Sequence, residues 1–194
     1  MGEVVVVRHG QTEWSKVGKH TSVTDLPLLP EGEEQARALR RPLATRRFVE
    51  VRVSPRLRAR TTAELAGLPT DTVDPDLVEV DYGCWEGRTT PDISAELGRT
   101  WSVWTDGTEP GDTPGETLAE VAARCDRVLD RVRPRLADGD VALVAHGHVL
   151  RILTARWLGL DPQAGSLFAL HAGSFGTLGH EHDRPVLAGW NQAG

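Results

Sequence analysis

The sequence predicts an α/β fold, a three-layer α/β/α sandwich with a mostly parallel central sheet. Two observations predict it. The four consecutive valines at 4–7 form a short, β-branched apolar run, which is typical of a strand buried on both faces of a sheet. Beyond this run, strand-like and helix-like segments alternate along the chain, and such alternation predicts a parallel sheet with helices on its faces.

The first part of the chain follows this alternation. Residues 15–29 form a loop-like connection, and its length suggests a role of its own. An acidic first turn and a spaced apolar stripe predict a helix over 30–43. A β-rich run over 48–54 predicts the second strand, and the proline that follows it opens a helix over 55–65.

The later segments complete the sandwich. They are an extended segment over 71–79, helices over 89–97, 116–136 and 148–158, and strands over 140–145, 173–180 and 185–190. The helix over 116–136 has the clearest i, i+3, i+4, i+7 pattern. Residues 98–115 are irregular and rich in glycine and proline, so we expect a single domain over 1–194 with a lid-like insertion around 98–115.

Composition limits the function. The formal charge of −6 argues against a general nucleic-acid surface, so an anion site in this chain has to be a local basic pocket. No apolar run approaches the length of a membrane span, and the valines after Glu3 are too few for a signal peptide. Of the two cysteines, Cys125 falls on the apolar face of a predicted helix, which indicates a reducing, cytoplasmic protein without disulfides.

Two predicted strands end in the same way. The valine run continues into Arg8-His9-Gly10, and the strand over 140–145 continues into His146-Gly147. If these parallel strands are neighbours, the two imidazoles face each other at the edge where open α/β sheets bind ligands. Arg58 follows a third strand, and arginines around a histidine suggest a phosphate, since the guanidinium fork matches its oxygens. For Arg56 and Arg60 an exposed helix face is the simpler interpretation.

At this point the sequence resembles the histidine phosphatase, or phosphoglycerate mutase-like, superfamily. Four motifs carry the resemblance in the family's order: Arg8-His9-Gly10-Gln11-Thr12-Glu13-Trp14, Ser54-Pro55-x-x-Arg58-Ala59, Glu79-x-Asp81-Tyr82-Gly83-x-Trp85-Glu86-Gly87, and Ala145-His146-Gly147. The resemblance spans nearly the whole chain and implies a phosphoglycerate mutase-like fold.

The resemblance also implies roles. His9 would attack phosphorus and become a phosphohistidine, and Arg8, Arg58 and His146 would surround the transferring phosphoryl group. Glu79 matches the family's acid/base. No metal or cofactor is implied, because the arginines and imidazole neutralise the charge.

Substrate contacts are expected from the residues around the nucleophile. They are Arg8, Arg58, Ser15, Thr21, Lys16, Lys19, Gly147 and Trp104. The chain departs from the family in two places: many members have asparagine at Ser15 and a Thr-Gly pair at Thr21-Ser22. Trp101 is also expected near the substrate. The run over 14–28 resembles the phosphatase branch that includes fungal sedoheptulose bisphosphatase and acid phosphatases.

The comparison with this branch suggests a second basic patch that would bind a phosphate that is not cleaved. Its members would be Lys16, Lys19, His20 and Arg56. The alternative, weighed equally, is that both lysines are solvated loop residues. The other histidines are weaker candidates. For His148, solvation or a cap-like contact in the first helical turn is favoured over catalysis. The pair His180 and His182 lacks a third ligand for a metal, and His171 is left open.

The sequence therefore predicts a cytoplasmic, metal-independent phosphomonoesterase for small phosphorylated metabolites, such as sugar phosphates or bisphosphates, as a monomer or homodimer without nucleic-acid or membrane partners. A phosphoglycerate-type mutase is the alternative enzyme. Mutases of the family have a longer lid and C-terminal tail to keep water from the phosphohistidine, so hydrolysis is favoured here. A non-catalytic module that binds phosphorylated ligands is the third possibility, and the retention of His9 and Glu79 argues against it.

Overall fold

Five strands form one sheet in the order β2-β3-β1-β4-β5 in the computed structural model, which describes residues 2–194. The strands are β1 (Val4–Arg8), β2 (Phe48–Val53), β3 (Asp140–Ala145), β4 (Phe175–Glu181) and β5 (Arg184–Gln192). β3 pairs in parallel with both β1 and β2, whereas β4 runs antiparallel to β1 and to β5. The sheet is therefore mixed, and the parallel order that we expected holds for three of its five strands.

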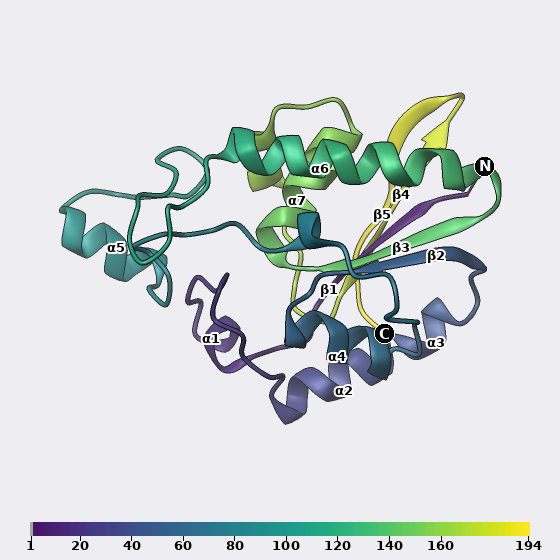
Figure 1. Cartoon of the computed structure of the whole chain (residues 1–194), viewed down its shortest axis with the longest axis horizontal. Coiled ribbons are helices and arrows are strands. Elements are labelled where there is room, and N and C mark those ends of the chain that lie inside the picture. The colour runs from purple at the N-terminus through teal and green to yellow at the C-terminus, as the bar shows by residue number, and fades with distance from the viewer. Residues whose placement is uncertain (1) are drawn as a thin grey trace.

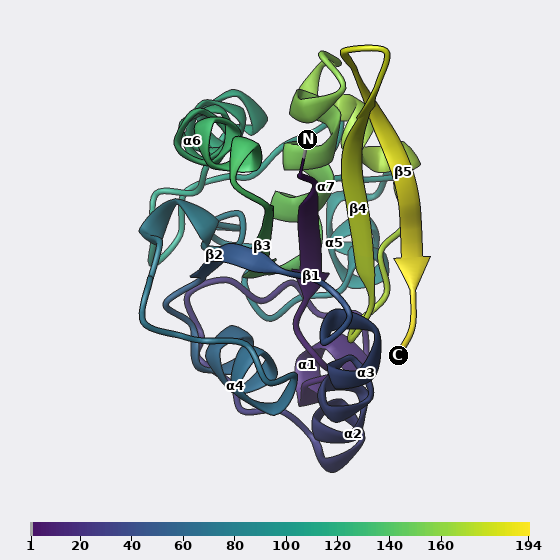
Figure 2. The same cartoon turned by 90° about the vertical axis from the view of Figure 1, so that its right-hand side faces the viewer.

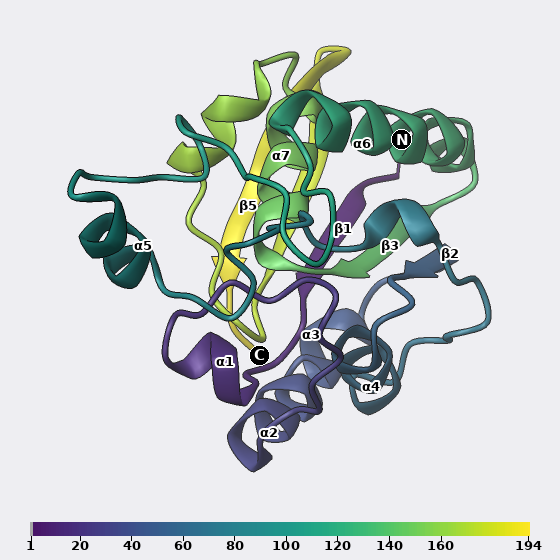
Figure 3. The ribbon, with the colours of Figure 1, turned by 60° about the vertical axis from the view of Figure 1, so that its left-hand side comes forward.

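Helices cover both faces of the sheet and confirm the three layers (Figures 1 and 2). One face carries α6 (Leu118–Val132) and α7 (Gly147–Trp157), and the other carries α2 (Pro30–Ala38), α3 (Arg40–Leu43) and α4 (Leu57–Leu65). Helices α1 (Glu13–Lys16) and α5 (Thr90–Leu97) lie beyond the carboxyl ends of β1 and β3 (Figure 3). In the described part of the chain, 2–194, no helix has the length and apolar character to cross a bilayer.

The valine run of β1 explains the two-sided core. Val4 and Val6 belong to the apolar cluster beneath α6 and α7, whereas Val5 and Val7 belong to the cluster beneath α2 to α4. Successive side chains of a strand point to opposite faces, so one run fills both cores, and all four valines are fully buried. The predicted interior strand is confirmed.

The register of β1 and β3 places the two strand-end motifs together. Arg8 pairs with Ala145, and the His9 amide then donates to the Ala145 carbonyl at 3.0 Å. His9 directly follows Arg8, and His146 directly follows Ala145. Both imidazoles therefore reach the carboxyl edge of the sheet from neighbouring strands. The predicted adjacency of these strands is confirmed.

The long helix is shorter than predicted. α6 ends at Val132, and a 3₁₀ helix, η2 (Arg133–Ala137), replaces the expected continuation to Leu136. Pro134 is the physical reason, because proline lacks the amide hydrogen and its ring disfavours helical geometry in the preceding turn. The loop expected from Ser15 also begins with a helical turn, α1, which Thr12 and Ser15 close in a capping box.

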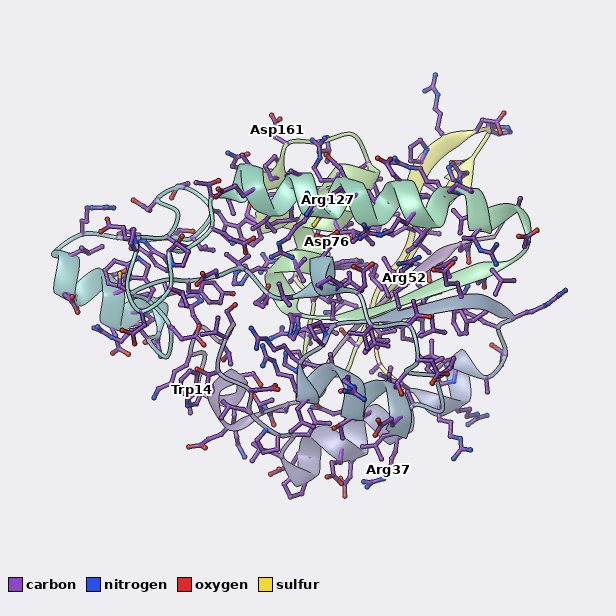
Figure 4. The ribbon with its side chains drawn as sticks, in the orientation of Figure 1. Trp14, Arg37, Arg52, Asp76, Arg127 and Asp161 are labelled. Carbon is purple, nitrogen blue, oxygen red and sulfur yellow. The ribbon has the colours of Figure 1, made fainter. Side chains whose placement is uncertain are left out.

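An arginine stripe on α6 fixes the segment that leads to Glu79. Arg124 donates to the carbonyl oxygens of Asp76 and Val78 at 2.7 and 2.6 Å, and Arg131 bonds the Asp76 carboxylate at 2.6 Å. Figure 4 shows Arg127 on α6 beside Asp76, with which it also pairs. These contacts attach the 3₁₀ helix η1 (Pro75–Leu77) to α6. They therefore fix the backbone just before Glu79.

Truncating a leucine under α6 and α7 should destabilise the fold. Leu143 of β3 is fully buried, and Leu143→Ala is expected to lower the free energy of unfolding by about 2–5 kcal/mol, through lost transfer energy and a residual cavity. The matched control, Leu167→Ala, removes a side chain that is 77% exposed and should change it by less than about 0.5 kcal/mol. Urea unfolding of both variants tests this, and equal losses would contradict it.

Candidate active site

A cavity opens at the carboxyl ends of β1 and β3, and charged and aromatic side chains from distant parts of the chain line it. Its lining residues are Arg8, His9, Ser15, Gly18, Lys19, His20, Thr21, Glu79, Tyr82, Gly147, His148 and Arg151. Three cationic side chains and one carboxylate are among them. The site thus lies at the predicted sheet edge and is locally basic, although the protein as a whole is acidic.

His9 is held with one ring nitrogen free. Its Nδ1 lies 2.7 Å from the carbonyl oxygen of Gly10, which can only accept, so Nδ1 carries the proton and Nε2 the lone pair. Burial, followed by the positive charges of Arg58 and Arg8, lowers the pKa of His9 well below its usual value. The imidazole is therefore neutral, and its Nε2 is available as a nucleophile.

His146 lies beside His9, with ring centroids 5.1 Å apart, but both of its nitrogens are already bonded. Nδ1 accepts from Nε of Arg58 at 3.2 Å, which leaves the proton on Nε2, 2.7 Å from the Ser54 hydroxyl. Burial and the charge of Arg58 lower its pKa well below the ordinary value. His146 is thus a neutral ring within the site's framework and does not line the cavity.

Arg58 is completely buried behind the cavity wall. Besides His146, its guanidinium donates to the carbonyl oxygens of Thr21, Ser22 and Thr24 at 3.0–3.3 Å. The Glu86 carboxylate holds the same loop by accepting from the amides of Ser22 and Thr24. Arg58 therefore shapes the loop that brings Thr21 to the cavity, and its own guanidinium does not line it.

Arg8 is the cation nearest to the nucleophile in sequence, and it does line the cavity. It donates to the Leu170 carbonyl, and its buried Nε has no partner in the described chain. A Cβ at Gly147 would lie 3.2 Å from Cζ of Arg8, so glycine gives the guanidinium its room. No carboxylate within residues 2–194 forms an ion pair with Arg8, and burial lowers its pKa. A buried guanidinium of this kind calls for an anionic ligand.

Glu79 is fixed by three backbone amides. Its carboxylate accepts from Val80, His148 and Val149 at 2.9–3.0 Å, and the last two belong to the first turn of α7. A helix N-terminus has free amides and a partial positive charge, so it suits a carboxylate. Glu79 is 5% exposed and lines the cavity with His9.

The lysines differ in position. Lys19 lines the cavity and lies 5.4 Å from the ring centroid of Trp14, whereas Lys16 pairs with Glu31 at 3.3 Å in solvent and does not line it. Of the two lysines of the expected basic patch, only Lys19 lies at the cavity. His20 lines the cavity as well, and Arg56 does not.

The other expected contacts fall on the wall or just behind it. Ser15, Thr21 and Gly147 line the cavity. Trp104 stands behind it, 4.9 Å from the ring of His148, and Trp101 is buried against His20. The tryptophans therefore support the wall and do not form its surface.

Tyr82, His148 and Arg151 line the cavity but were not among the predicted site residues. For His148, solvation or a cap-like contact in the first helical turn was favoured over catalysis, but its ring lines the cavity and bonds the Tyr82 hydroxyl at 2.6 Å. Burial raises the pKa of Tyr82 and lowers that of His148. Arg151 also lines the site. The second histidine of His146-Gly147-His148 was a visible signal, and the position of Arg151 one turn later on the same helix was another.

Within residues 2–194, no three His, Cys, Asp or Glu side chains gather where they would hold a metal ion. His180 packs instead on Trp157, with ring centroids 4.9 Å apart, and His182 lies in the turn between β4 and β5. Metal independence stays a prediction.

Comparison with known proteins places this geometry in a family. A family model described as histidine phosphatase superfamily (branch 1) matches residues 4–193. An acid phosphatase of Mycobacterium tuberculosis is 38% identical over 95% of this chain and 90% of its own length. Sedoheptulose 1,7-bisphosphatase of Saccharomyces cerevisiae is 37% identical over 82% of this chain and 68% of its length.

A solved structure of an open reading frame product from Mycobacterium tuberculosis has a TM-score of 0.92 at 35% identity, over 99% of this chain and 98% of that one. These relatives confirm that the chain is an enzyme of the histidine phosphatase type. The chain belongs to the histidine phosphatase superfamily, branch 1.

Proposed function

We propose that this chain is a metal-independent phosphomonoester hydrolase that acts through a phosphohistidine on His9. The observation that supports this most directly is the neutral His9 with its free Nε2, set in a cavity with the guanidinium of Arg8, which has no carboxylate partner among residues 2–194. A neutral imidazole can attack phosphorus, and a cation beside it stabilises the charge on the phosphoryl oxygens.

The reaction has two steps. Nε2 of His9 attacks phosphorus as the bond to the ester oxygen breaks, and Glu79 gives a proton to the departing alkoxide, so the alcohol is released. A water molecule then attacks the phosphohistidine, Glu79 takes its proton, and the N–P bond breaks to release inorganic phosphate. Both residues line the same cavity, as this sequence of steps requires.

The arginines have separate roles in this scheme. Arg8 contacts the phosphoryl group, whereas Arg58 and His146 are positioning residues: Arg58 shapes the loop of Thr21, and His146 packs against the nucleophile. This differs from the expectation that all three groups surround the phosphoryl group. The difference follows from the hydrogen bonds that already occupy Arg58 and His146.

The substrates are small phosphorylated metabolites. The names of the two relatives, an acid phosphatase and a sugar bisphosphatase, support this class. A phosphate-release screen over sugar phosphates, sugar bisphosphates, phosphoglycerates and nucleotides, with and without chelator, tests the proposal. Release from none of them, or release that needs a divalent ion, would refute it. A cytoplasmic location, a monomer or homodimer, and the lid role of 98–115 stay predictions.

Replacing the nucleophile should abolish turnover without unfolding the protein. His9→Ala removes the only atom proposed to accept the phosphoryl group, and we expect at least about a thousandfold loss of kcat. Rapid quench with labelled substrate should trap acid-labile phosphoenzyme in the parent protein and none in the variant. Label on another residue, or undiminished turnover, would contradict the mechanism.

Replacing the acid should discriminate between leaving groups. Glu79→Gln cannot supply a proton, so hydrolysis of alkyl phosphates should fall by about a hundredfold or more, while p-nitrophenyl phosphate, whose leaving group needs no proton, should lose far less. Steady-state kinetics on both substrates measures the contrast. Equal losses would assign Glu79 a structural role at the start of α7.

The buried histidines should make the fold sensitive to acid. Burial lowers the pKa of His20 to about 4, below the unfolded value of about 6.5, so between these values the unfolded chain binds the proton and the folded chain does not. Stability from this residue is present above pH 6.5 and falls as the pH decreases. Between pH 7.5 and pH 5.0, the contribution of His20 to the free energy of unfolding should fall by about 2 kcal/mol.

Urea unfolding at the two pH values tests this prediction. His20→Gln should reduce the acid loss of unfolding free energy by that amount, whereas the exposed control His182→Gln should leave it unchanged. The same loss in the parent and both variants would show that His20 does not titrate in this way.

A further inference from the structure

The loop that precedes β4 holds the cation of the proposed reaction. The Leu170 carbonyl of this loop accepts from Nη1 of Arg8, the side chain that contacts the phosphoryl group in the scheme above. The loop also binds the backbone at the end of β1. Gly173 donates to the His9 carbonyl at 2.9 Å, and the Ser174 carbonyl accepts from the Arg8 amide at 2.9 Å. The position of the Arg8 guanidinium therefore depends on how this loop is fixed.

Asn191, near the end of β5, bonds the other side of the peptide group that holds Arg8. Its Oδ1 accepts from the His171 amide at 2.8 Å. The His171 amide and the Leu170 carbonyl belong to one planar peptide unit. Two hydrogen bonds in series thus join Asn191 to Nη1 of Arg8 through this unit. Hydrogen bonds in such a chain polarise one another, and the orientation of the peptide plane sets where its carbonyl holds the guanidinium.

The Asn191 side chain is itself fixed by further contacts. Oδ1 also accepts from the Ser174 hydroxyl at 2.9 Å, and Nδ2 donates to Nδ1 of His171 at 3.1 Å. The backbone φ of Asn191 is +54°, in the left-handed region that asparagine adopts more readily than most residues other than glycine. A residue in this region persists where its surroundings determine its conformation, and such residues gather at functional sites.

Trp190 binds the same loop from the preceding position of β5. Its Nε1 donates to the Ala169 carbonyl at 2.6 Å, and its ring packs on Phe168 with centroids 6.0 Å apart. β5 is the edge strand of the sheet and is separated from β1 by β4 (Figure 2). The loop therefore connects the end of an edge strand to the arginine at the end of the central one.

We propose that Asn191 is a positioning residue for Arg8: by fixing the peptide unit between Leu170 and His171, it sets the guanidinium in the orientation that receives the phosphoryl group. This inference rests on the proposed hydrolase function, in which Arg8 binds that group. Asn191 does not line the cavity, so its effect on the reaction passes through Arg8.

A double-mutant cycle tests this path. Asn191→Gly removes the side chain and keeps a residue suited to a positive φ. It should lower kcat/KM for p-nitrophenyl phosphate by about ten- to thirtyfold in the parent protein. In the Arg8→Met background the same change should cost less than about threefold, because the group through which Asn191 acts is gone. Equal losses in both backgrounds, or no loss in the parent, would overturn the inference.

Three further variants make the result specific. Asp183 lies in the turn between β4 and β5, with a φ of +64° and an exposed side chain, so Asp183→Gly should leave kcat/KM unchanged. Asn191→Asp keeps the acceptor oxygens and should retain more activity than Asn191→Gly, and equal losses in these two variants would also contradict the role. Urea unfolding checks that each variant is folded. Should Asn191→Gly not fold, Asn191→Ser replaces it in the cycle, since the shorter side chain cannot span the same partners.

A binding measurement separates this inference from the hydrolase proposal. In the His9→Ala background, calorimetry with inorganic phosphate reports on Arg8 without turnover. Asn191→Gly should raise the dissociation constant about five- to thirtyfold, whereas Asp183→Gly should change it less than about twofold. This pattern supports the role of Asn191 even where the parent protein hydrolyses no ester. Turnover by the parent protein together with additive losses in the cycle overturns the role of Asn191 and leaves the hydrolase proposal intact.

Discussion

The buried guanidinium of Arg58 is the constraint on which the rest of the site depends. It has no exposed surface, so its donors need partners inside the protein, and they find the carbonyl oxygens of Thr21, Ser22 and Thr24 and the ring of His146. The loop that closes the cavity and the tautomer of His146 are therefore set by the same side chain. Each of these carbonyls would lose a buried donor without Arg58, at about 1–3 kcal/mol for each group left unsatisfied.

The electrostatics of the site follow from this arrangement. Burial of the His9 ring, and after it the charges of Arg58 and Arg8, lowers the pKa of His9 and keeps its imidazole neutral. An anion bound at Arg8 would cancel part of that charge, and it would bring its phosphorus to the free lone pair. In the proposed mechanism, the positive charge that would attract the phosphoryl group also opposes protonation of His9.

Sequence predicted the parts of this protein that depend on local pattern. The valine run predicted a two-sided strand, and the expectation that two parallel strands are neighbours placed His9 and His146 together at one edge of the sheet. Local sequence pattern did not predict that β4 runs antiparallel to β1, because strand direction depends on pairing between distant parts of the chain. Nor did it show that Lys16 pairs with Glu31 or that Arg151 lines the cavity, since both depend on how distant loops pack. Pro134 marks the early end of α6 in the sequence, whereas the apolar pattern by itself predicts a helix that continues to Leu136.

The pairing of β1 has a consequence for how the protein is made. Its partners are β3 and β4, which enter the chain more than 130 residues later, as the register of Val4 with Val141 and Leu178 shows. On the ribosome, the four valines therefore have no sheet to join until most of the chain has been synthesised. Long-range pairing of this kind slows folding and leaves apolar strand edges exposed to aggregation. The active site can therefore assemble only after β3 and the start of α7 have been synthesised.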